Sequence, residues 1–126
     1  HDFKPANIHA GGLRYHGAGM IISQLIKDGY MHGVDIPQSE SFEAGMLFAR
    51  TEGIIPAPES CHAIAATIRE AMKAKEAGEE KVILFCLSGH GLIDMPSYES
   101  YINGDLHDYA VSDEEIKKFL ATVPEV

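Results

Sequence analysis

The sequence predicts an α/β fold in which helices pack on strands. An unbroken apolar run over residues 82–87 has the length and composition of a strand buried on both faces of a sheet. A short apolar segment at 34–36 indicates a second strand, and two helical patterns lie between these strands along the chain. This order is typical of layered α/β folds. Because a stable parallel sheet needs more than two strands, we expect the 126-residue chain to be part of a larger domain.

The first helices are predicted from apolar spacing and from the residues that end helices. From Met20 onward, apolar residues recur three and four positions apart, and Gly29 ends this helix. Ser39 or Ser41 is expected to cap the next helix, which ends just before Gly53.

The second half of the chain begins with an extended link over residues 54–58, because its two prolines disfavour both a helix and a central strand. Ser60 is expected to cap a long helix that ends at Gly78. After the predicted strand and a turn at 88–91, the tyrosine-rich chain is predicted to be mostly irregular. Ser112 opens a capping box and begins the last predicted helix.

The composition narrows the class of protein. Hydrophobic residues make up 45% and charged residues 23%, and the formal charge of −9 argues against nucleic acid and anionic membrane as partners. Two cysteines, Cys61 and Cys86, do not make a disulfide framework, so we expect both to be reduced and the protein to be cytoplasmic. The chain has no apolar run of transmembrane length. It opens at His1 without an initiator methionine, which again indicates a piece of a larger protein.

Ser88 is the first candidate for a functional residue. It follows the apolar run 82–87 directly and precedes Gly89, a position where strand ends of α/β sheets meet ligands. A single hydroxyl there could meet a cofactor or substrate, although a strand-end Ser-Gly pair more often forms only a turn.

Other chemical patterns are weaker. Seven histidines show no zinc-site spacing, and Ser88, His90 and Asp94 lie too close in sequence for a hydrolase triad. From composition alone, Glu52 is a surface acid paired with Arg50. The glycines between residues 11 and 19 do not follow a dinucleotide-binding or Walker pattern.

Three segments together resemble one family. They are His-Asp-Phe-Lys-Pro-Ala-Asn-Ile-His-Ala-Gly-Gly-Leu-Arg-Tyr-His-Gly at 1–17, Arg-Thr-Glu-Gly-Ile-Ile-Pro-Ala-Pro-Glu-Ser at 50–60 with His62, and Leu-Phe-Cys-Leu-Ser-Gly-His-Gly at 84–91. Their order and spacing resemble the C-terminal third of the tryptophan synthase beta chains, in detail those of the second, longer type. The resemblance implies that residues 1–126 are the C-terminal part of a pyridoxal-phosphate-dependent catalytic domain of fold type II, with a three-layer αβα architecture.

The same resemblance implies the residues near the cofactor. Ser88 would hydrogen-bond the pyridine nitrogen of pyridoxal 5′-phosphate, with Gly89 and Gly12 also at the cofactor. A hydroxyl is too weak an acid to protonate this nitrogen, so the ring stays a moderate electron sink, which favours β-elimination over transamination. Glu52 would lie near the phenolic side of the cofactor and tune its charge. This role replaces the interpretation of Glu52 as a surface acid.

A further implied site is a loop that binds a monovalent cation, K⁺ or Na⁺. The backbone carbonyls of Leu13, Tyr15 and Gly17 would be its ligands. Two positions depart from the better-known type of beta chain, which has an acid in place of Arg14 and an arginine in place of His90. A cation at Arg14, on the substrate side, suits an anionic leaving group such as phosphate.

The implied parent protein is a pyridoxal-phosphate-dependent lyase of tryptophan biosynthesis. It would join indole to an aminoacrylate derived from L-serine or O-phosphoserine, and it would be a homodimer; binding of an alpha chain stays open. In this family the Schiff-base lysine and the phosphate loop lie upstream of residue 1, so the isolated fragment is expected to be inactive.

Two alternatives remain at this stage. The chain could be a stand-alone, non-catalytic module that binds a small molecule or a partner chain. It could also belong to another fold-type II enzyme, such as a threonine synthase or a dehydratase, which the segments at 12–15 and 52–56 match less well.

Overall fold

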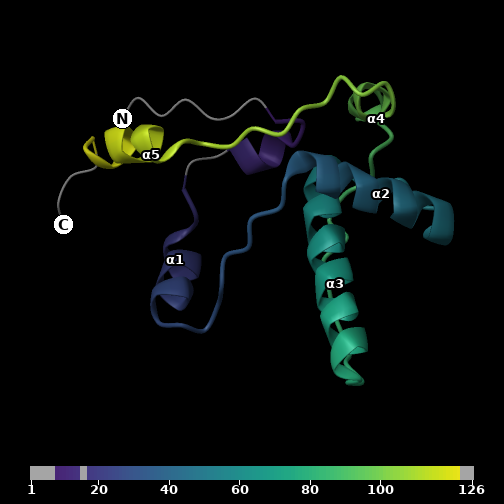
Figure 1. The fold of residues 1–126 in the computed structure, drawn as a ribbon, viewed down its shortest axis with the longest axis horizontal. Coiled ribbons are helices and arrows are strands. Elements are labelled where there is room, and N and C mark those ends of the chain that lie inside the picture. Colours follow the sequence, from purple (N-terminus) through teal and green to yellow (C-terminus); the bar gives the residue numbers. More distant parts are fainter. Residues whose placement is uncertain (1–7, 15–16, 123–126) are drawn as a thin grey trace.

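The computed structural model describes residues 8–14 and 17–122. The described chain is helical, and Figure 1 shows two long helices that meet at the right of the view, with one short helix above them and two more at the left. The elements in chain order are the 3₁₀ helix η1 (Gly11–Arg14) and the α-helices α1 (Met20–Lys27), α2 (Gln38–Glu52), α3 (Pro58–Ala77), α4 (Met95–Ile102) and α5 (Asp113–Leu120).

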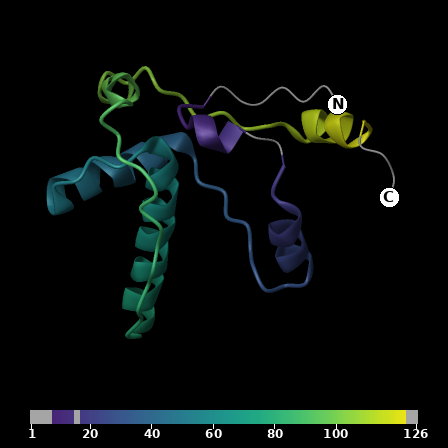
Figure 2. The ribbon, with the colours of Figure 1, turned by 180° about the vertical axis from the view of Figure 1, so that it is seen from behind.

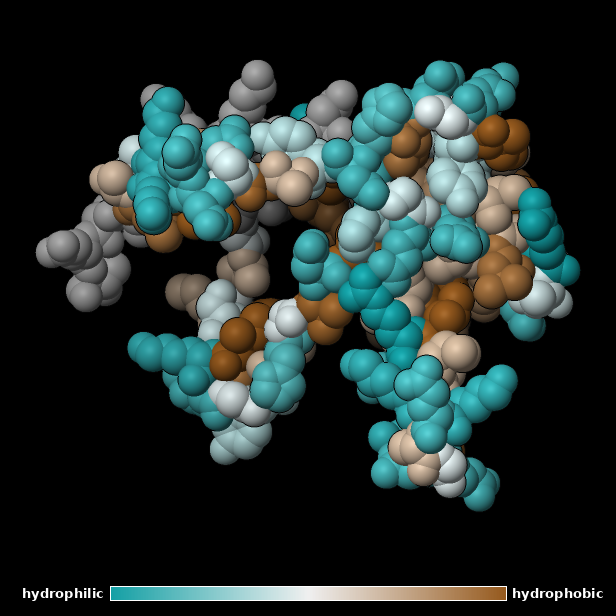
Figure 3. All heavy atoms as spheres, viewed as in Figure 1, coloured by the Kyte–Doolittle hydropathy of each residue, from teal (hydrophilic) through white to brown (hydrophobic). Residues whose placement is uncertain are grey.

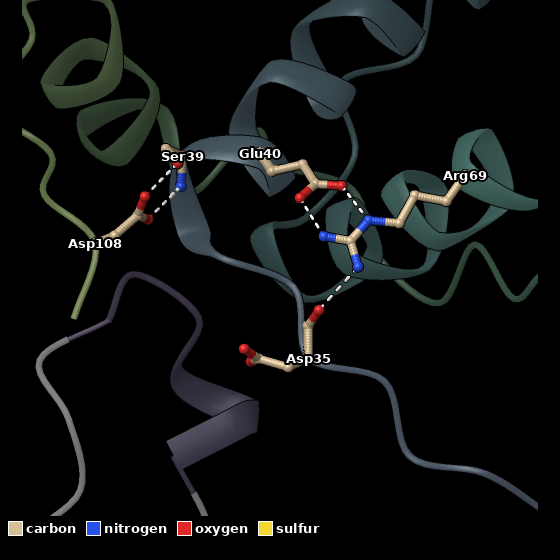
Figure 4. Close-up of polar contacts among 5 residues, drawn as sticks. All are labelled: Asp35, Ser39, Glu40, Arg69 and Asp108. Carbon is tan, nitrogen blue, oxygen red and sulfur yellow. Dashed lines mark hydrogen bonds and ion pairs between the residues drawn. The ribbon is translucent and has the colours of Figure 1, made fainter. Parts of the chain in front are cut away.

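Helices α2 and α3 form the centre of the fold. Small residues on their facing sides let the two backbones approach closely, with Ala44 and Ala65 buried beside Ile64. Gly45 is required at this crossing, because a Cβ atom there would lie 2.4 Å from the Cys61 sulfur. A half-exposed ion pair, Glu40 with Arg69, joins the same two helices, and the Arg69 guanidinium also donates to the Asp35 carbonyl at 3.0 Å (Figure 4).

Helix α4 covers one end of this pair through an aromatic cluster. Phe42 of α2 contacts the Tyr98 ring edge-on at 5.1 Å between centroids and stacks with Tyr101 at 5.8 Å. The Tyr98 hydroxyl donates to the Pro56 carbonyl at 2.6 Å and lies 3.2 Å from the Cys61 sulfur. Burial raises the pKa of both the Tyr98 and the Cys61 side chains, so both are neutral core groups.

The prediction of an irregular chain after residue 91 is wrong, because α4 forms there. Pro96 lies in the first turn of this helix, where its missing N–H costs nothing. The helices α1 and α5 are confirmed: α1 ends beside Gly29, which has a φ of 78°, and Ser112 makes both hydrogen bonds of its capping box with Glu115.

The predicted N-caps of α2 and α3 are wrong. Helix α2 begins at Gln38 after Pro37. A distant residue caps this N-terminal end: the Asp108 carboxylate accepts from the backbone N–H and the hydroxyl of Ser39 (Figure 4). Helix α3 begins at Pro58, which places Ser60 inside the first turn instead of at the cap. The predicted ends at Gly53 and Gly78 are confirmed, since both glycines adopt the left-handed conformation.

The predicted strands at 34–36 and 82–87 do not form, and no strand is present in residues 8–14 and 17–122. The three-layer αβα arrangement is therefore not seen in this part of the chain. Residues 82–87 return along α3 (Figure 2), with Ile83 and Phe85 half-buried and Phe85 edge-on to Phe48 at 5.9 Å. Val82 and Leu84 on the other side are 101% and 95% exposed. The segment has strand-like alternation, but the described part of the chain holds no strand with which it could pair.

Helices α1 and α5 do not pack against any other described helix. Met20 at the start of α1 is 90% exposed, and Figure 3 shows apolar side chains on the surface of this region. Among the residues that the structure describes, no helix is both long and apolar enough to cross a membrane.

Candidate functional site

The Ser88 loop (residues 88–91) is held against the segment that follows α2. His90 and Pro56 form an antiparallel bridge, in which Ala57 N donates to Gly89 O at 2.9 Å and Gly91 N donates to Ile55 O at 2.8 Å. Two of the three segments that carry the family resemblance are therefore in direct contact. The bridge fixes the backbone of the loop directly beside the serine hydroxyl.

The close contact requires glycine at position 91 and leaves little room for a side chain at position 89. A Cβ atom at Gly91 would lie 2.4 Å from the Pro56 carbonyl oxygen, and one at Gly89 would lie 3.1 Å from the Ala57 Cβ. Larger residues would push the loop away from the segment 55–57. Gly89, predicted at the cofactor, thus has a packing role that the structure itself explains.

The Ser88 side chain is exposed, and one side-chain group lies beside it. Its hydroxyl is 3.3 Å from the hydroxyl of Ser60, which is 2% exposed in the first turn of α3. The Ser60 hydroxyl also accepts from Gly89 N at 3.2 Å and lies 3.4 Å from Gly89 O. Ser60 therefore supports both the hydroxyl of Ser88 and the next peptide group.

The third segment of the resemblance reaches the same helix end. The backbone N–H of Gly12, in η1, donates to the Glu59 carboxylate at 2.8 Å. Glu59 and Ser60 are consecutive, so the first turn of α3 holds η1 with one residue and the Ser88 loop with the next. The amide of Gly12, predicted at the cofactor, is occupied by Glu59 in this structure.

The side chains of the other predicted positions that the structure describes, at Leu13, Arg14 and Glu52, make no hydrogen bond or ion pair with a described residue. Leu13, Arg14 and Gly17 are exposed, and Tyr15 lies outside the described residues. Glu52 is the exposed last residue of α2, and the described residues include no ion pair between it and Arg50. The structure thus gives no support to the interpretation of Glu52 as a partner of Arg50.

The His9 ring contacts a distant segment, with Nδ1 3.1 Å from the Ser97 hydroxyl, whereas the rings of His62 and His90 make local contacts. His62 Nδ1 is 2.9 Å from the Pro58 carbonyl, and His90 Nδ1 accepts from Leu92 N at 3.3 Å. No hydrogen bond joins Ser88 to His90 in the part of the chain that the structure describes, so the geometry of a hydrolase triad is missing there. The described residues contain no cluster of metal-ligating side chains.

One described cavity lies apart from the Ser88 loop. Its volume is about 450 Å³, and it opens between η1, the segment before α2 and the segment after α4, with Leu13, Asp35 and Tyr109 among its lining residues. Neither Ser88 nor Glu52 lines it. At its edge, the hydrogen bonds from Ser39 lower the pKa of the Asp108 carboxyl.

Sequence reasoning missed Glu59 and Ser60 as contact residues. Ser60 was expected to cap its helix, although Pro58 two residues earlier is the better signal, since proline favours the first helical position. With the helix starting at Pro58, the Ser60 hydroxyl is not needed at the cap and is free to bind another segment. No local signal predicts the contact of Glu59 with Gly12, which lies 47 residues away.

The arrangement defines a class of protein segment, a helical unit in which the first turn of α3 contacts both the Ser88 loop and the glycine-rich turn η1. Similarity to curated proteins identifies the family to which this segment is related. The tryptophan synthase beta chain 2 of Aquifex aeolicus is 59% identical over 108 residues, 86% of this chain and 25% of the relative. That of Thermotoga maritima is 61% identical over 97 residues, 77% of this chain and 23% of the relative. No protein-family model matches the chain.

A relative from Pyrococcus furiosus, also a tryptophan synthase beta chain 2, matches 98% of this chain at 51% identity. The chain is thus homologous, over most of its length, to part of the tryptophan synthase beta chains, and the resemblance seen in its motifs is confirmed. The chain spans about a quarter of the length of the curated relatives that it matches.

Proposed function

We propose that this chain is the C-terminal portion of a pyridoxal-phosphate-dependent lyase that joins indole to the three-carbon unit of L-serine or O-phosphoserine. The observation that carries the proposal is the contact of the three motif segments with one another around the first turn of α3. Relatives named tryptophan synthase beta chain support it through 51–61% identity over 97–124 residues of this chain.

The residues of the Ser88 loop fit a pyridoxal phosphate ring. The Ser88 hydroxyl is exposed, neutral and supported from behind by Ser60, so it can donate a hydrogen bond to an unprotonated pyridine nitrogen. When bound, the cofactor supplies an electron sink for carbanion chemistry. The part of Ser88 is to hold the ring nitrogen without giving it a full proton, which keeps that sink moderate.

Three further roles belong to the proposal. Glu52, exposed and without an ion-pair partner among the described residues, would tune the charge on the phenolic side of the cofactor. Arg14, exposed at the end of η1, would face the leaving group of the amino-acid substrate. The carbonyls of the neighbouring loop, at Leu13, Tyr15 and Gly17, would bind K⁺ or Na⁺.

The exposed apolar surfaces support a larger domain. Residues 82–86 expose every second side chain and have no strand partner among the described residues, and α1 exposes apolar side chains to solvent. We infer that in the full-length protein 82–87 becomes a strand of a three-layer αβα domain, with helices on both faces of the sheet. The domain would belong to a cytoplasmic homodimer.

A stand-alone binding module is the weaker proposal. Such a module would leave Val82 and Leu84 almost fully in water, which an independently folding domain avoids at contiguous positions.

Tryptophan formation tests the proposed function directly. The full-length protein is incubated with indole, L-serine or O-phosphoserine, and K⁺, with and without pyridoxal phosphate, and products are separated by liquid chromatography. We expect tryptophan only when the cofactor is present. Absence of tryptophan with either donor, from protein that binds the cofactor, would contradict the proposed reaction; a different amino-acid product would favour another fold-type II enzyme.

A further inference from the structure

The hydroxyl of Ser60 lies beside the hydroxyl of Ser88, at 3.3 Å. Ser60 lies 2% exposed in the first turn of α3, and its hydroxyl is within 3.4 Å of three groups: Ser88 Oγ, Gly89 N and Gly89 O. Of these, Gly89 N can only donate, so the Ser60 oxygen accepts from it. The single Ser60 proton then has two possible acceptors, Ser88 Oγ and Gly89 O.

The two acceptors are not equivalent. Gly89 O already accepts from Ala57 N at 2.9 Å, whereas Ser88 Oγ has no other hydrogen-bond partner among the described residues. Donation from Ser60 to Ser88 therefore satisfies the more available acceptor. It also leaves the proton of Ser88 free. The reverse arrangement, with Ser88 donating to Ser60, would consume that proton.

We propose that Ser60 is a positioning residue that holds Ser88 as a hydrogen-bond donor toward the ring nitrogen of pyridoxal phosphate. The inference rests on the proposed function, because it takes the ring nitrogen as the acceptor that Ser88 meets. A chain of donors runs from Gly89 N and Ser60 through Ser88 to the ring. Helix α3 and the bridge between His90 and Pro56 fix the buried end of this series of hydrogen bonds.

The test uses the full-length protein and two variants, Ser60→Ala and Ser88→Ala, alone and combined. The affinity for pyridoxal phosphate is measured by titration of the apoprotein, and the ¹⁵N resonance of the bound, ring-labelled cofactor is recorded by NMR. We expect Ser60→Ala to weaken cofactor binding roughly 2- to 10-fold, the range of one hydrogen bond. We also expect the ¹⁵N resonance to move part of the way toward its position in Ser88→Ala. The double variant should match Ser88→Ala alone.

Ser41→Ala is the matched control. Ser41 is a buried serine of the adjacent helix α2, and its hydroxyl has no hydrogen-bond partner among the described residues. The same chemical change there should leave both the affinity and the resonance as in the unaltered protein. In the apoprotein, Ser60→Ala should also speed amide hydrogen exchange at Gly89, because its N–H loses its acceptor.

The outcomes distinguish a failure of the role of Ser60 from a failure of the proposed contact between Ser88 and the ring nitrogen. If Ser88→Ala shifts the ring resonance but Ser60→Ala does not, the role of Ser60 is overturned while the contact of Ser88 stands. If Ser88→Ala leaves the resonance unchanged, the ring contact itself is wrong, and the inference fails with it. Should Ser60→Ala not fold, Ser60→Cys fills similar space with a weak donor and is expected to give an intermediate shift; an unshifted resonance would overturn the inference equally.

Discussion

Ser88 is the residue through which the proposed chemistry can be altered most directly. Its hydroxyl is exposed, while the backbone beside it is fixed by two hydrogen bonds to the segment 55–57. A substitution at Ser88 therefore changes the group offered to the cofactor and leaves the loop in place. Substitutions at Gly91 test the packing of the loop, and substitutions at Arg14 test the choice of substrate.

Replacing Ser88 by aspartate should change which products are formed. A carboxylate beside the pyridine nitrogen stabilises its protonated form, which makes the ring a stronger electron sink and favours transamination. In the full-length protein we expect Ser88→Asp to increase the ratio of keto acid to tryptophan, measured by liquid chromatography, with Ser88→Ala as the comparison. An unchanged ratio would show that Ser88 does not contact the ring nitrogen.

Gly91→Ala should destabilise the full-length protein, because the new Cβ would lie 2.4 Å from the Pro56 carbonyl oxygen. We expect the free energy of unfolding in urea to fall by about 1–3 kcal/mol, the usual cost of overpacking. Gly33→Ala is the control, since a Cβ at Gly33 meets nothing within 4 Å. Equal stability of the two variants would mean that the Ser88 loop does not lie against residue 56 as described.

Arg14 is expected to influence the choice of amino-acid donor. If Arg14 pairs with a departing phosphate, the full-length protein should have a higher kcat/KM with O-phosphoserine than with L-serine, and Arg14→Asp should reverse this preference. Lys27→Asp makes a comparable charge change at the exposed end of α1 and should preserve it. Steady-state kinetics at fixed K⁺ concentration measure both ratios; equal values for the two donors, unaffected by Arg14→Asp, would assign Arg14 a structural role.

At the scale of the elements, the helix ends are stabilised by contacts between distant segments. Asp108 caps α2 from 69 residues away, and the first turn of α3 holds both η1 and the Ser88 loop. These contacts fix where each motif segment lies, and they can be tested without the cofactor.

Asp108→Ala should weaken the start of α2 in a pH-dependent way. Hydrogen bonds from Ser39 hold the pKa of Asp108 below its ordinary value of 3.8, so its stabilisation is complete above that value and is lost as the pH falls through the lowered pKa. At pH 7 we expect a loss of about 0.5–1 kcal/mol in the free energy of unfolding of the full-length protein, at the low end for caps because Asp108 is exposed.

The difference between Asp108→Ala and the unaltered protein should shrink as the pH falls below about 4, in urea unfolding curves recorded at several pH values. Asp105→Ala is the control, because the Asp105 carboxylate has no hydrogen-bond partner among the described residues. A difference that is the same at pH 3 and pH 7 would show that the charged carboxylate does not cap the helix.

The elements that sequence predicted correctly are those decided by local chemistry. Glycines with positive φ end α2 and α3 as expected at Gly53 and Gly78, and the capping box at Ser112 depends on residues only three apart. The starts of α2 and α3 were misassigned because a serine near a helix start is a common cap, whereas Asp108 and Pro58 supply the actual starts. Helix α4 was missed because its proline was not recognised as an N-terminal signal.

The site was predictable only in part. The apolar run before Ser88 supplied that residue as a candidate, resemblance to a family supplied its role and Glu52, and the structure then placed the motif segments of the chain in contact. The support from Ser60 depends on a fold in which α3 lies beside the Ser88 loop, and no spacing along the chain reveals it. Similarly, the apolar run 82–87 predicts a strand, but a strand forms only with a partner that the described residues do not supply.

At the scale of the whole molecule, the described chain forms one packed centre with several uncovered surfaces. Phe42, Cys61 and Tyr98 are buried, whereas residues 82–87 and α1 expose large apolar side chains. Since the curated relatives are about four times longer than the matched part, we propose that the rest of a full-length protein covers these surfaces and supplies the cofactor-linked lysine.

The central claim is that residues 1–126 supply one part of a pyridoxal phosphate site in the full-length protein and do not bind the cofactor by themselves. Its most direct test is an absorbance titration with pyridoxal phosphate, performed in parallel on the full-length protein and on residues 1–126. The account predicts a saturable band with one equivalent bound for the full-length protein, and no saturable band for residues 1–126, whose lysines match no cofactor-binding motif of the family. A stoichiometric band with residues 1–126, removed by a single Lys→Ala substitution, would contradict it.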